Sequence, residues 1–321
     1  MKREVQIPLI KKMPAAKGSG VLPAAIAICS VIMALAGCTK NSDTVIIDRT
    51  GRSVAIKGAI NRIVSTAPSN TEIIADLGMA DKLIAIDRYS HNVAGIPEGL
   101  VLVDFSFPDA EAILALQPDV IIANGHNVTG SGEDPFRMLR ELGIPVAYIS
   151  MSRSISDIYT DIAFVADLLQ VKDRGEQLIS AMKASINELA GKAAQVKTKR
   201  SVYLEISAAP EMISFGKDSY INDMISVIGA RNIFGNDLWI VFPSAEAIIE
   251  RNPDVILTGV DYLDDPVGEI KSRYGFDTIN AVINNRVFRI DTDSLVRPSA
   301  RIIPALRQMA AAVYPEVYEQ E

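Results

Sequence analysis

Short apolar segments alternate with stretches of helix length along most of the chain, and this alternation constrains the fold more than any other feature of the sequence. Such a pattern is typical of an α/β domain, in which parallel strands lie side by side and helices cover both faces of the sheet. In the first half the apolar segments are 62–65, 83–86, 120–123 and 146–149. Ahead of them, two β-rich segments flank a polar turn at 49–52, which predicts a β-hairpin.

A long amphipathic segment interrupts the alternation between residues 172 and 194. Its apolar side chains, among them Met182, Ile186 and Leu189, recur three and four residues apart, which indicates one buried helix face. Short apolar segments return at 202–206, 255–258 and 286–290. The sequence therefore predicts two α/β lobes joined by one long helix. We place the first lobe at 38–170, the bridging helix at 171–198 and the second lobe at 199–321.

One segment occurs twice, once in each predicted lobe. Residues 109–121 and 244–256 each begin with a residue suited to cap a helix, continue with Ala-Glu-Ala-Ile and reach Pro-Asp-Val-Ile at the same spacing. Each copy predicts a short helix, a turn that begins at Pro and a buried strand. The repeat indicates that the two lobes are related halves, with Glu111 and Glu246 at equivalent positions.

The N-terminus carries a targeting segment. Basic residues precede an apolar run at 21–36, which is short for a membrane-spanning helix, so a permanent anchor helix is the weaker interpretation. The run ends in Leu-Ala-Gly-Cys38, which resembles a bacterial lipobox, where the Cys is lipidated and becomes the first mature residue. We therefore expect residues 1–37 to be a signal peptide and the mature protein to be extracytoplasmic and lipid-anchored. Whether translation begins at Met1 or Met13 stays open.

Charge and cysteine content narrow the class of protein. Without residues 1–37 the chain keeps 27 basic and 38 acidic residues, a net charge near -11. An acidic chain of this kind lacks the basic surface that nucleic acid requires. Cys29 leaves with the signal peptide, so Cys38 is the one cysteine of the mature chain and no intramolecular disulfide can form.

The sequence lacks the motifs of common enzyme classes. It contains no GxSxG, P-loop, GxGxxG or HExxH pattern. His91 and His126 are its only histidines, too few for a zinc or manganese site built on several imidazoles. A carboxylate site for a hard metal stays open, although no acidic cluster has recognisable ligand spacing. These observations favour a binding protein for an organic or chelated ligand, with no catalytic residue, resident metal or cofactor.

A capping-box pattern follows the first strand of the parallel sheet. Ser69 and Glu72 stand three residues apart just before apolar residues, which predicts the start of a helix. The turn also lies at the carboxyl end of a strand, where ligands bind in open α/β sheets. We give the structural role more weight.

Four segments together resemble binding proteins for ferric siderophores and cobalamin. They are 62–73, 110–121, 214–217 together with 228–234, and 297–302, and the likeness extends over almost the whole mature chain. The resemblance implies two Rossmann-like lobes bridged by a rigid helix, with the ligand in the cleft between them. It further implies a monomer that delivers a metal chelate to the permease and ATPase of an ABC importer.

The resemblance also points to ligand-binding residues. Tyr89 and Trp239 occupy positions where relatives carry cleft aromatics, whereas Phe105 and Asn124 stand where cobalamin binders carry Trp. Two altered aromatics make cobalamin a weaker choice than a ferric siderophore. For Tyr89 and Phe105 the alternative is ordinary core packing.

Charged residues and candidate axial ligands also bear on the class of ligand. Arg88 and Arg297 are expected to meet the anionic face of a ferric chelate or haem propionates, the alternative being surface ion pairs. Haem would need an axial ligand such as Tyr89, Met212 or His91. A ferric siderophore is the first ligand class, and haem or cobalamin the second. A surface enzyme acting on a tetrapyrrole and an adhesin are rival functions, because fold does not fix function.

The resemblance assigns Glu111 and Glu246 a different role. In related proteins the Glu at each matching position pairs with Arg residues of the permease, one Glu on each lobe. The alternative is that each carboxylate only stabilises the first turn of its helix.

Overall fold

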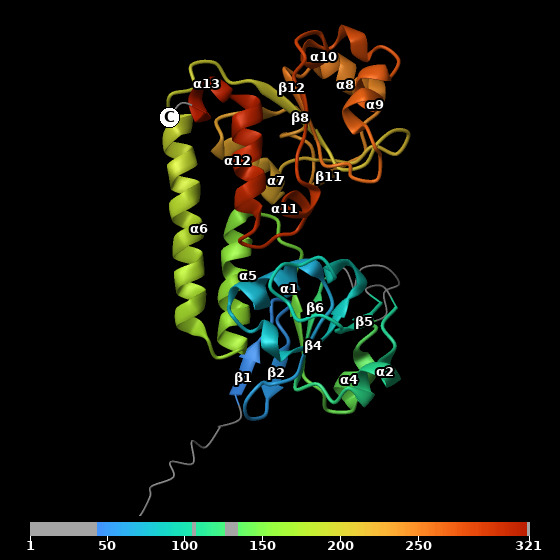
Figure 1. Cartoon of the computed structure of the whole chain (residues 1–321), viewed down its shortest axis with the longest axis vertical. Coiled ribbons are helices and arrows are strands. Elements are labelled where there is room, and N and C mark those ends of the chain that lie inside the picture. The colour runs from blue at the N-terminus through green and yellow to red at the C-terminus, as the bar shows by residue number, and fades with distance from the viewer. Residues whose placement is uncertain (1–43, 105–106, 126–133, 320–321) are drawn as a thin grey trace, which may run out of the picture. The chain divides into compact units, whose positions relative to one another are not determined.

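The computed structural model describes residues 44–104, 107–125 and 134–319 (Figure 1). Residues 1–37, expected to be a signal peptide, lie outside the described residues, as do Cys38, Phe105 and His126. The parallel strands of each lobe form one sheet, and the predicted α/β fold with two lobes is confirmed. The domain boundaries chosen from the sequence stay a prediction.

The sheet of the first lobe contains five parallel strands in the order β5-β4-β3-β6-β7. They are β3 (Ile63–Ser65), β4 (Leu83–Asp87), β5 (Val101–Val103), β6 (Val120–Asn124) and β7 (Val146–Ile149). The helices and 3₁₀ turns of this part are α1 (Pro68–Asp76), η1 (Ala80–Lys82), η2 (Arg88–Ser90), α2 (Ala110–Ala115), α4 (Arg137–Glu141) and α5 (Ile155–Leu168). The predicted hairpin is present as β1 (Thr44–Ile47) paired with β2 (Ser53–Ile56). Every residue of β3, β6 and β7 is buried, because helices cover both faces of the sheet.

The second lobe contains a four-stranded parallel sheet in the order β10-β8-β12-β13. Its strands are β8 (Ser201–Glu205), β10 (Arg231–Asn232), β12 (Val255–Thr258) and β13 (Val287–Arg289). A separate antiparallel ribbon pairs β9 (Ser214–Phe215) with β11 (Ile240–Val241). The helices are α7 (Tyr220–Val227), α8 (Ala245–Arg251), α9 (Pro266–Ser272), α10 (Asn280–Ile283), α11 (Thr292–Val296), α12 (Ile302–Val313) and α13 (Pro315–Tyr318), with one 3₁₀ turn, η3 (Phe276–Thr278).

The long helix α6 (Lys172–Ala193) packs against elements of both lobes, as Figure 1 shows. It contacts α5 of the first lobe and α7, α12 and α13 of the second. Its predicted apolar face is buried and belongs to one core cluster that also contains Ile162 of α5 and Leu306 of α12. A Cβ at Gly175 would lie 2.4 Å from the Cβ of Ala166, so glycine is what allows α5 and α6 to approach this closely.

The two copies of the sequence repeat fold alike. The Asp109 carboxylate caps α2 by accepting from the backbone N–H groups of Glu111 and Ala112, both at 3.0 Å. The Ser244 hydroxyl caps α8 by accepting from the N–H of Ala247 at 3.2 Å. Each helix leads into a central buried strand, β6 or β12, as the repeat predicts.

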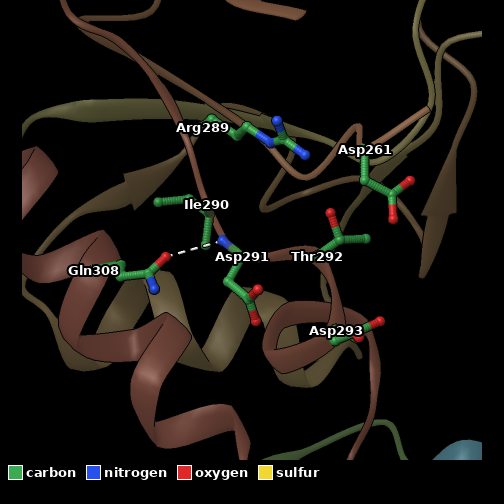
Figure 2. A pocket seen from close by; sticks show the side chains of 7 residues that line it. All are labelled: Asp261, Arg289, Ile290, Asp291, Thr292, Asp293 and Gln308. Atoms are coloured by element: carbon green, nitrogen blue, oxygen red, sulfur yellow. Dashed lines mark hydrogen bonds between the residues drawn. The ribbon is translucent and has the colours of Figure 1, made fainter. Parts of the chain in front are cut away.

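The carboxyl end of β13 opens onto a hollow of about 450 Å³. Figure 2 shows its lining residues, Asp261, Arg289, Ile290, Asp291, Thr292, Asp293 and Gln308. The amide oxygen of Gln308 accepts from the backbone N–H of Asp291 at 2.9 Å, which ties α12 to this edge of the sheet. Three carboxylates and one guanidinium give the hollow an acidic character.

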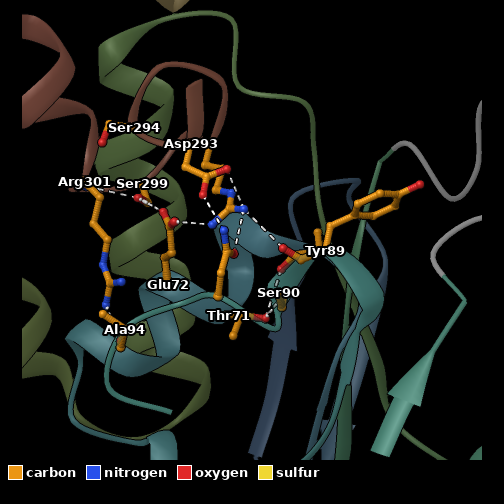
Figure 3. A network of polar contacts seen from close by, with 12 residues as sticks. Thr71, Glu72, Tyr89, Ser90, Ala94, Asp293, Ser294, Ser299 and Arg301 are labelled. Atoms are coloured by element: carbon orange, nitrogen blue, oxygen red, sulfur yellow. Dashed lines mark hydrogen bonds and ion pairs between the residues drawn. The ribbon is translucent and has the colours of Figure 1, made fainter. Parts of the chain in front are cut away.

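A buried polar cluster joins the lobes beside this hollow (Figure 3). Glu72, on α1 of the first lobe, lies 3.3 Å from Arg297 and accepts from the Ser299 hydroxyl at 2.6 Å. Arg297 also pairs with Asp293 at 2.7 Å and donates to the backbone oxygen of Tyr89 at 3.1 Å. We call Glu72, Asp293, Arg297 and Ser299 the inter-lobe cluster. A second pair, Arg301–Asp76 at 2.7 Å, reinforces it.

The predicted capping box is wrong. Helix α1 begins at Pro68 after the N-cap residue Ala67, and no side chain caps it. Proline suits this first position because it lacks the N–H group that would remain unpaired and its φ angle is already helical. The Glu72 carboxylate is therefore not needed at the start of the helix and reaches the second lobe instead.

Burial dominates the ionisation of Glu72. Its side chain is almost wholly buried, and desolvation raises the pKa of the carboxyl group above its ordinary value although Ser299 and Arg297 oppose the rise. The ionised form therefore costs free energy that its partners only partly offset.

We predict a pH-dependent difference between the wild-type chain and Glu72→Gln. Because the folded pKa lies above 4.5, the native state holds the proton more tightly than the unfolded state. The stabilising contribution of Glu72 is thus fully present below pH 4.5 and is lost as the pH rises through the folded pKa. The free energy of unfolding of the wild type should fall relative to that of the variant across this window, as measured by urea unfolding at several pH values. A difference that grows in favour of the wild type would show that Arg297 outweighs burial.

Candidate functional site

Segments that follow strands of the first lobe contact the second lobe, since Arg297 donates to the backbone oxygen of Tyr89 and Arg153 contacts Trp239. Several large aromatic side chains stay exposed in segments that follow strands. From the first lobe, Tyr89 follows β4 and is 59% exposed, and Phe107 follows β5 and is 83% exposed. From the second lobe, Tyr262 follows β12 and is 63% exposed, and Phe242 follows β11 and is 74% exposed. Together with Trp239 we call these residues the aromatic rim. Exposed aromatic groups on facing lobes are the surface expected of a ligand site.

Tyr89 is held by its backbone, and its ring remains outside the polar cluster. The buried carboxylate of Asp87 accepts from the N–H of Tyr89 at 2.8 Å and also from the Ser90 hydroxyl, which fixes the turn η2. Figure 3 shows the Tyr89 ring pointing away from Glu72 and Asp293. The ring is therefore available to a ligand while the backbone oxygen serves Arg297.

Trp239 is fixed by the antiparallel ribbon. Its backbone oxygen accepts from the N–H of Gly216 at 2.9 Å, and the oxygen of Asp237 accepts from Lys217 at 2.9 Å. A Cβ at Gly216 would lie 2.3 Å from that Asp237 oxygen, so only glycine permits this approach. The indole is partly buried, and the guanidinium carbon of Arg153 from the first lobe lies 4.6 Å from its ring centroid.

The two arginines expected to meet the ligand both have acidic partners. Arg88 is half exposed and forms an ion pair with Asp104. Arg297 is buried and shares its guanidinium among Glu72, Asp293, Asn92 and the backbone of Tyr89. Their contact with a ligand stays a prediction, and in this structure Arg297 joins the lobes.

Met212 and Asn124 are buried rather than exposed on the rim. Met212 packs in the second core cluster with Tyr203 and Phe276, and its sulfur lies 3.3 Å from a nitrogen of Arg273. Asn124 is the last residue of β6 and is 5% exposed. Their roles toward a ligand also stay predictions.

Glu111 and Glu246 lie exposed in the first turns of α2 and α8. The capping hydrogen bonds come from Asp109 and Ser244. A hydrogen bond from its own backbone N–H, with a smaller contribution from the Ser244 hydroxyl, lowers the pKa of the Glu246 carboxyl. The side chain of Glu246 therefore stays ionised at neutral pH.

Other features of the described residues bear on the class of site. No three His, Cys, Asp or Glu side chains among them gather closely enough to hold a metal ion. No helix in the part of the chain that the structure describes is both long and apolar enough to cross a bilayer. Two further hollows lie elsewhere. One, of about 500 Å³, is lined by residues of the hairpin, α5 and α6. The other, of about 720 Å³, is lined mainly by residues 195–200 after α6 and by residues near the C-terminus, and neither hollow includes a residue of the aromatic rim.

Four residues of this region were missed in the sequence. Tyr262 follows the predicted strand β12, a position that a search for aromatics after apolar segments would have found. Phe107 and Phe242 follow β5 and β11, two strands that the sequence did not predict. Arg153 lies between β7 and α5 in a polar segment, and no sequence signal distinguishes it from an ordinary surface arginine.

Comparison with known proteins agrees with this geometry. Residues 63–294 match the family described as periplasmic binding protein. The uncharacterised ABC transporter substrate-binding lipoprotein YvrC of Bacillus subtilis is 30% identical over 280 residues, which are 85% of this chain and 86% of the relative. A vitamin B12-binding protein of Vibrio campbellii is 27% identical over 256 residues, 78% of this chain and 89% of the relative.

A solved structure extends the comparison. A possible iron-binding, periplasmic solute-binding protein from Staphylococcus epidermidis superposes with a TM-score of 0.71 at 28% identity, covering 79% of this chain and 99% of that one. The family match spans most of the two lobes, and the relatives are solute-binding proteins, not enzymes. The chain therefore belongs to the periplasmic binding protein family.

Proposed function

We propose that this chain is the solute-binding component of an ABC importer and that its ligand is an iron chelate, a ferric siderophore in the first place. The observation that carries the proposal is the aromatic rim, to which both lobes contribute exposed rings at the carboxyl ends of their sheets. Flat apolar faces of this kind desolvate a large organic chelate, and a few polar groups then fix its orientation.

The inter-lobe contacts support capture without a large change of shape. The buried cluster around Arg297 and the continuous core through α6 connect the lobes in the free protein. A site that is already formed requires little ordering when the ligand arrives, so more of the contact energy appears as affinity. The loaded protein then docks on a permease, whose ATPase drives transport.

Haem or cobalamin is the second ligand class. It is favoured by the vitamin B12-binding relative and by three aromatic side chains, Phe107, Phe242 and Tyr262, that offset the two altered positions noted in the sequence. A tetrapyrrole offers two broad faces, which suits rings supplied from both lobes.

Binding is tested through Trp239, the one tryptophan of the chain. Titration with ferric siderophores, haem and cobalamin should change its emission in a saturable way, because its indole belongs to the rim. Trp239→Ala should weaken the affinity for the chelate by at least about tenfold in calorimetry, since an aromatic side chain that becomes buried on binding commonly carries about 2 kcal/mol of binding energy.

Trp239→Phe is the matched control and should retain most of the affinity, because it keeps an aromatic face. If none of these chelates binds the wild type and bare zinc or manganese binds tightly instead, the proposed ligand class is wrong.

We further propose that Glu111 and Glu246 dock the protein on the permease. The double variant Glu111→Ala, Glu246→Ala should fold and bind ligand normally, because Asp109 and Ser244 supply the helix caps. It should lose uptake and stimulation of the importer's ATPase, since one acidic anchor on each lobe is missing. Glu141→Ala, an exposed acid on α4, is the control for loss of surface charge. If the double variant transports at the wild-type rate, the docking proposal is wrong and the two carboxylates only stabilise the first turns of their helices.

Anchoring through Cys38 is a separate proposal, supported by the lipobox-like sequence and by the naming of YvrC as a lipoprotein. Cys38→Ala should yield a soluble or unprocessed product, because the lipid needs a thiol to receive it. Detergent phase partitioning and labelling with radioactive palmitate measure this. Cys29→Ala lies within the signal peptide and should behave like the wild type. Membrane partitioning of a processed Cys38→Ala protein would contradict the proposal.

A further inference from the structure

One cationic side chain of the first lobe rests on an aromatic ring of the second. The guanidinium carbon of Arg153 lies 4.6 Å from the centroid of the Trp239 ring. Arg153 is exposed and comes from the segment between β7 and α5, at the carboxyl edge of the first sheet. The contact therefore places a positive charge within the aromatic rim.

Both partners of this contact are held by their backbones. The N–H of Arg153 donates to the carboxylate of Asp157 at 3.0 Å, and the N–H of Ile155 donates across the lobes to Asp223 of α7 at 3.0 Å. Trp239 is fixed by its hydrogen bond to Gly216 in the ribbon. The cation–π contact thus joins two segments whose backbones are held by hydrogen bonds.

The charge of Arg153 differs from those of the neighbouring arginines. Arg88 pairs with Asp104, Arg297 with Glu72 and Asp293, and Arg301 with Asp76. Arg289 lies among the carboxylates that line the hollow in Figure 2. Within the described residues, no carboxylate lies within ion-pair distance of the Arg153 guanidinium, which leaves its charge to be met by solvent or by a ligand.

Stacking does not use the hydrogen-bonding capacity of a guanidinium. Its N–H groups lie in the plane of the group, so a ring against one face leaves the edges free to donate to two oxygens of a carboxylate. We propose that Arg153 determines ligand specificity by receiving a peripheral carboxylate of the bound chelate while it remains stacked on Trp239. The ligand is then an anionic, carboxylate-bearing chelate rather than a neutral one. This inference rests on the proposed function.

The test compares chelates that differ in peripheral carboxylates. Hemin and its dimethyl ester form one pair, and ferric citrate and the neutral hydroxamate chelate ferrichrome form another, with cyanocobalamin as a further neutral probe. Calorimetric titration of the full chain should show the tightest binding for a carboxylate-bearing probe. Arg153→Gln should weaken the affinity for that probe by about tenfold to a hundredfold, because the carboxylate loses a charged hydrogen-bonding partner. Arg153→Lys should restore only part of the affinity, because an ammonium group does not donate in a planar fork.

Arg137→Gln is the matched control for net charge, because Arg137 lies exposed on α4 and pairs with Glu141. Acrylamide quenching of Trp239 in the free protein adds a readout without ligand, and it should increase in Arg153→Gln as the guanidinium leaves the ring.

The outcomes separate this inference from the proposed function. If a neutral probe binds most tightly, or if Arg153→Gln binds the anionic probe equally well or better, Arg153 is not the carboxylate receptor although chelate capture stands. If the wild type binds none of the probes, nor any ferric siderophore, the proposed function fails and the inference with it.

Discussion

The ion pair between Glu72 and Arg297 is the interaction on which the relation between the lobes depends. It is buried and joins residues more than two hundred positions apart. Hydrogen bonds from Ser299 to Glu72, and from Arg297 to Asn92 and the backbone oxygen of Tyr89, surround it. A buried pair of this kind contributes little net stability, because desolvation of the charges offsets their attraction. The pair instead fixes the relative position of the lobes, since the carboxylate and the guanidinium find their hydrogen-bonding partners only when the two lobes are correctly placed. The aromatic rim then has a defined separation before any ligand arrives.

Paired polar side chains and exposed aromatic rings occupy different parts of the region around this cluster. The polar side chains of Glu72, Arg297 and Ser299 pair with one another or with their neighbours. The side chains of Tyr89, Phe107, Phe242 and Tyr262, in contrast, stay exposed. A protein that had to be stable without ligand would gain by burying such rings, so their exposure indicates a surface kept for an apolar partner. The short turn η2 shows how one segment serves both purposes, because the Tyr89 backbone holds Arg297 while its ring faces the other way.

The sequence allowed most of the framework to be predicted, because the framework follows local rules. Alternating apolar segments predicted β3, β4, β6 and β7, and the spacing of Met182, Ile186 and Leu189 predicted the buried face of α6. Strand β5 was not predicted, since it lies at the edge of the sheet and its first two residues are exposed. The capping box failed because the helix starts at Pro68, two residues before the start that Ser69 as N-cap predicts, and because Glu72 pairs with Arg297, 225 residues away. Arg153 on Trp239 could not be foreseen for the same reason, because nothing in either local segment refers to the other.

The continuity of the core through α6 has a consequence for how the two halves came to coexist. The repeated segment points to duplication, yet the two lobes do not have separate cores. Ile162, Met182 and Leu306 belong to one apolar cluster. Gly175 lies so close to Ala166 that no solvent separates the two helices at this point. If the chain were divided at residue 198 and the halves separated, the apolar faces of α6 and α12 would be exposed to water. This exposure would cost free energy in proportion to the apolar area. The two lobes therefore share one core, and a wide separation of the lobes would break the contacts that α6 makes with both.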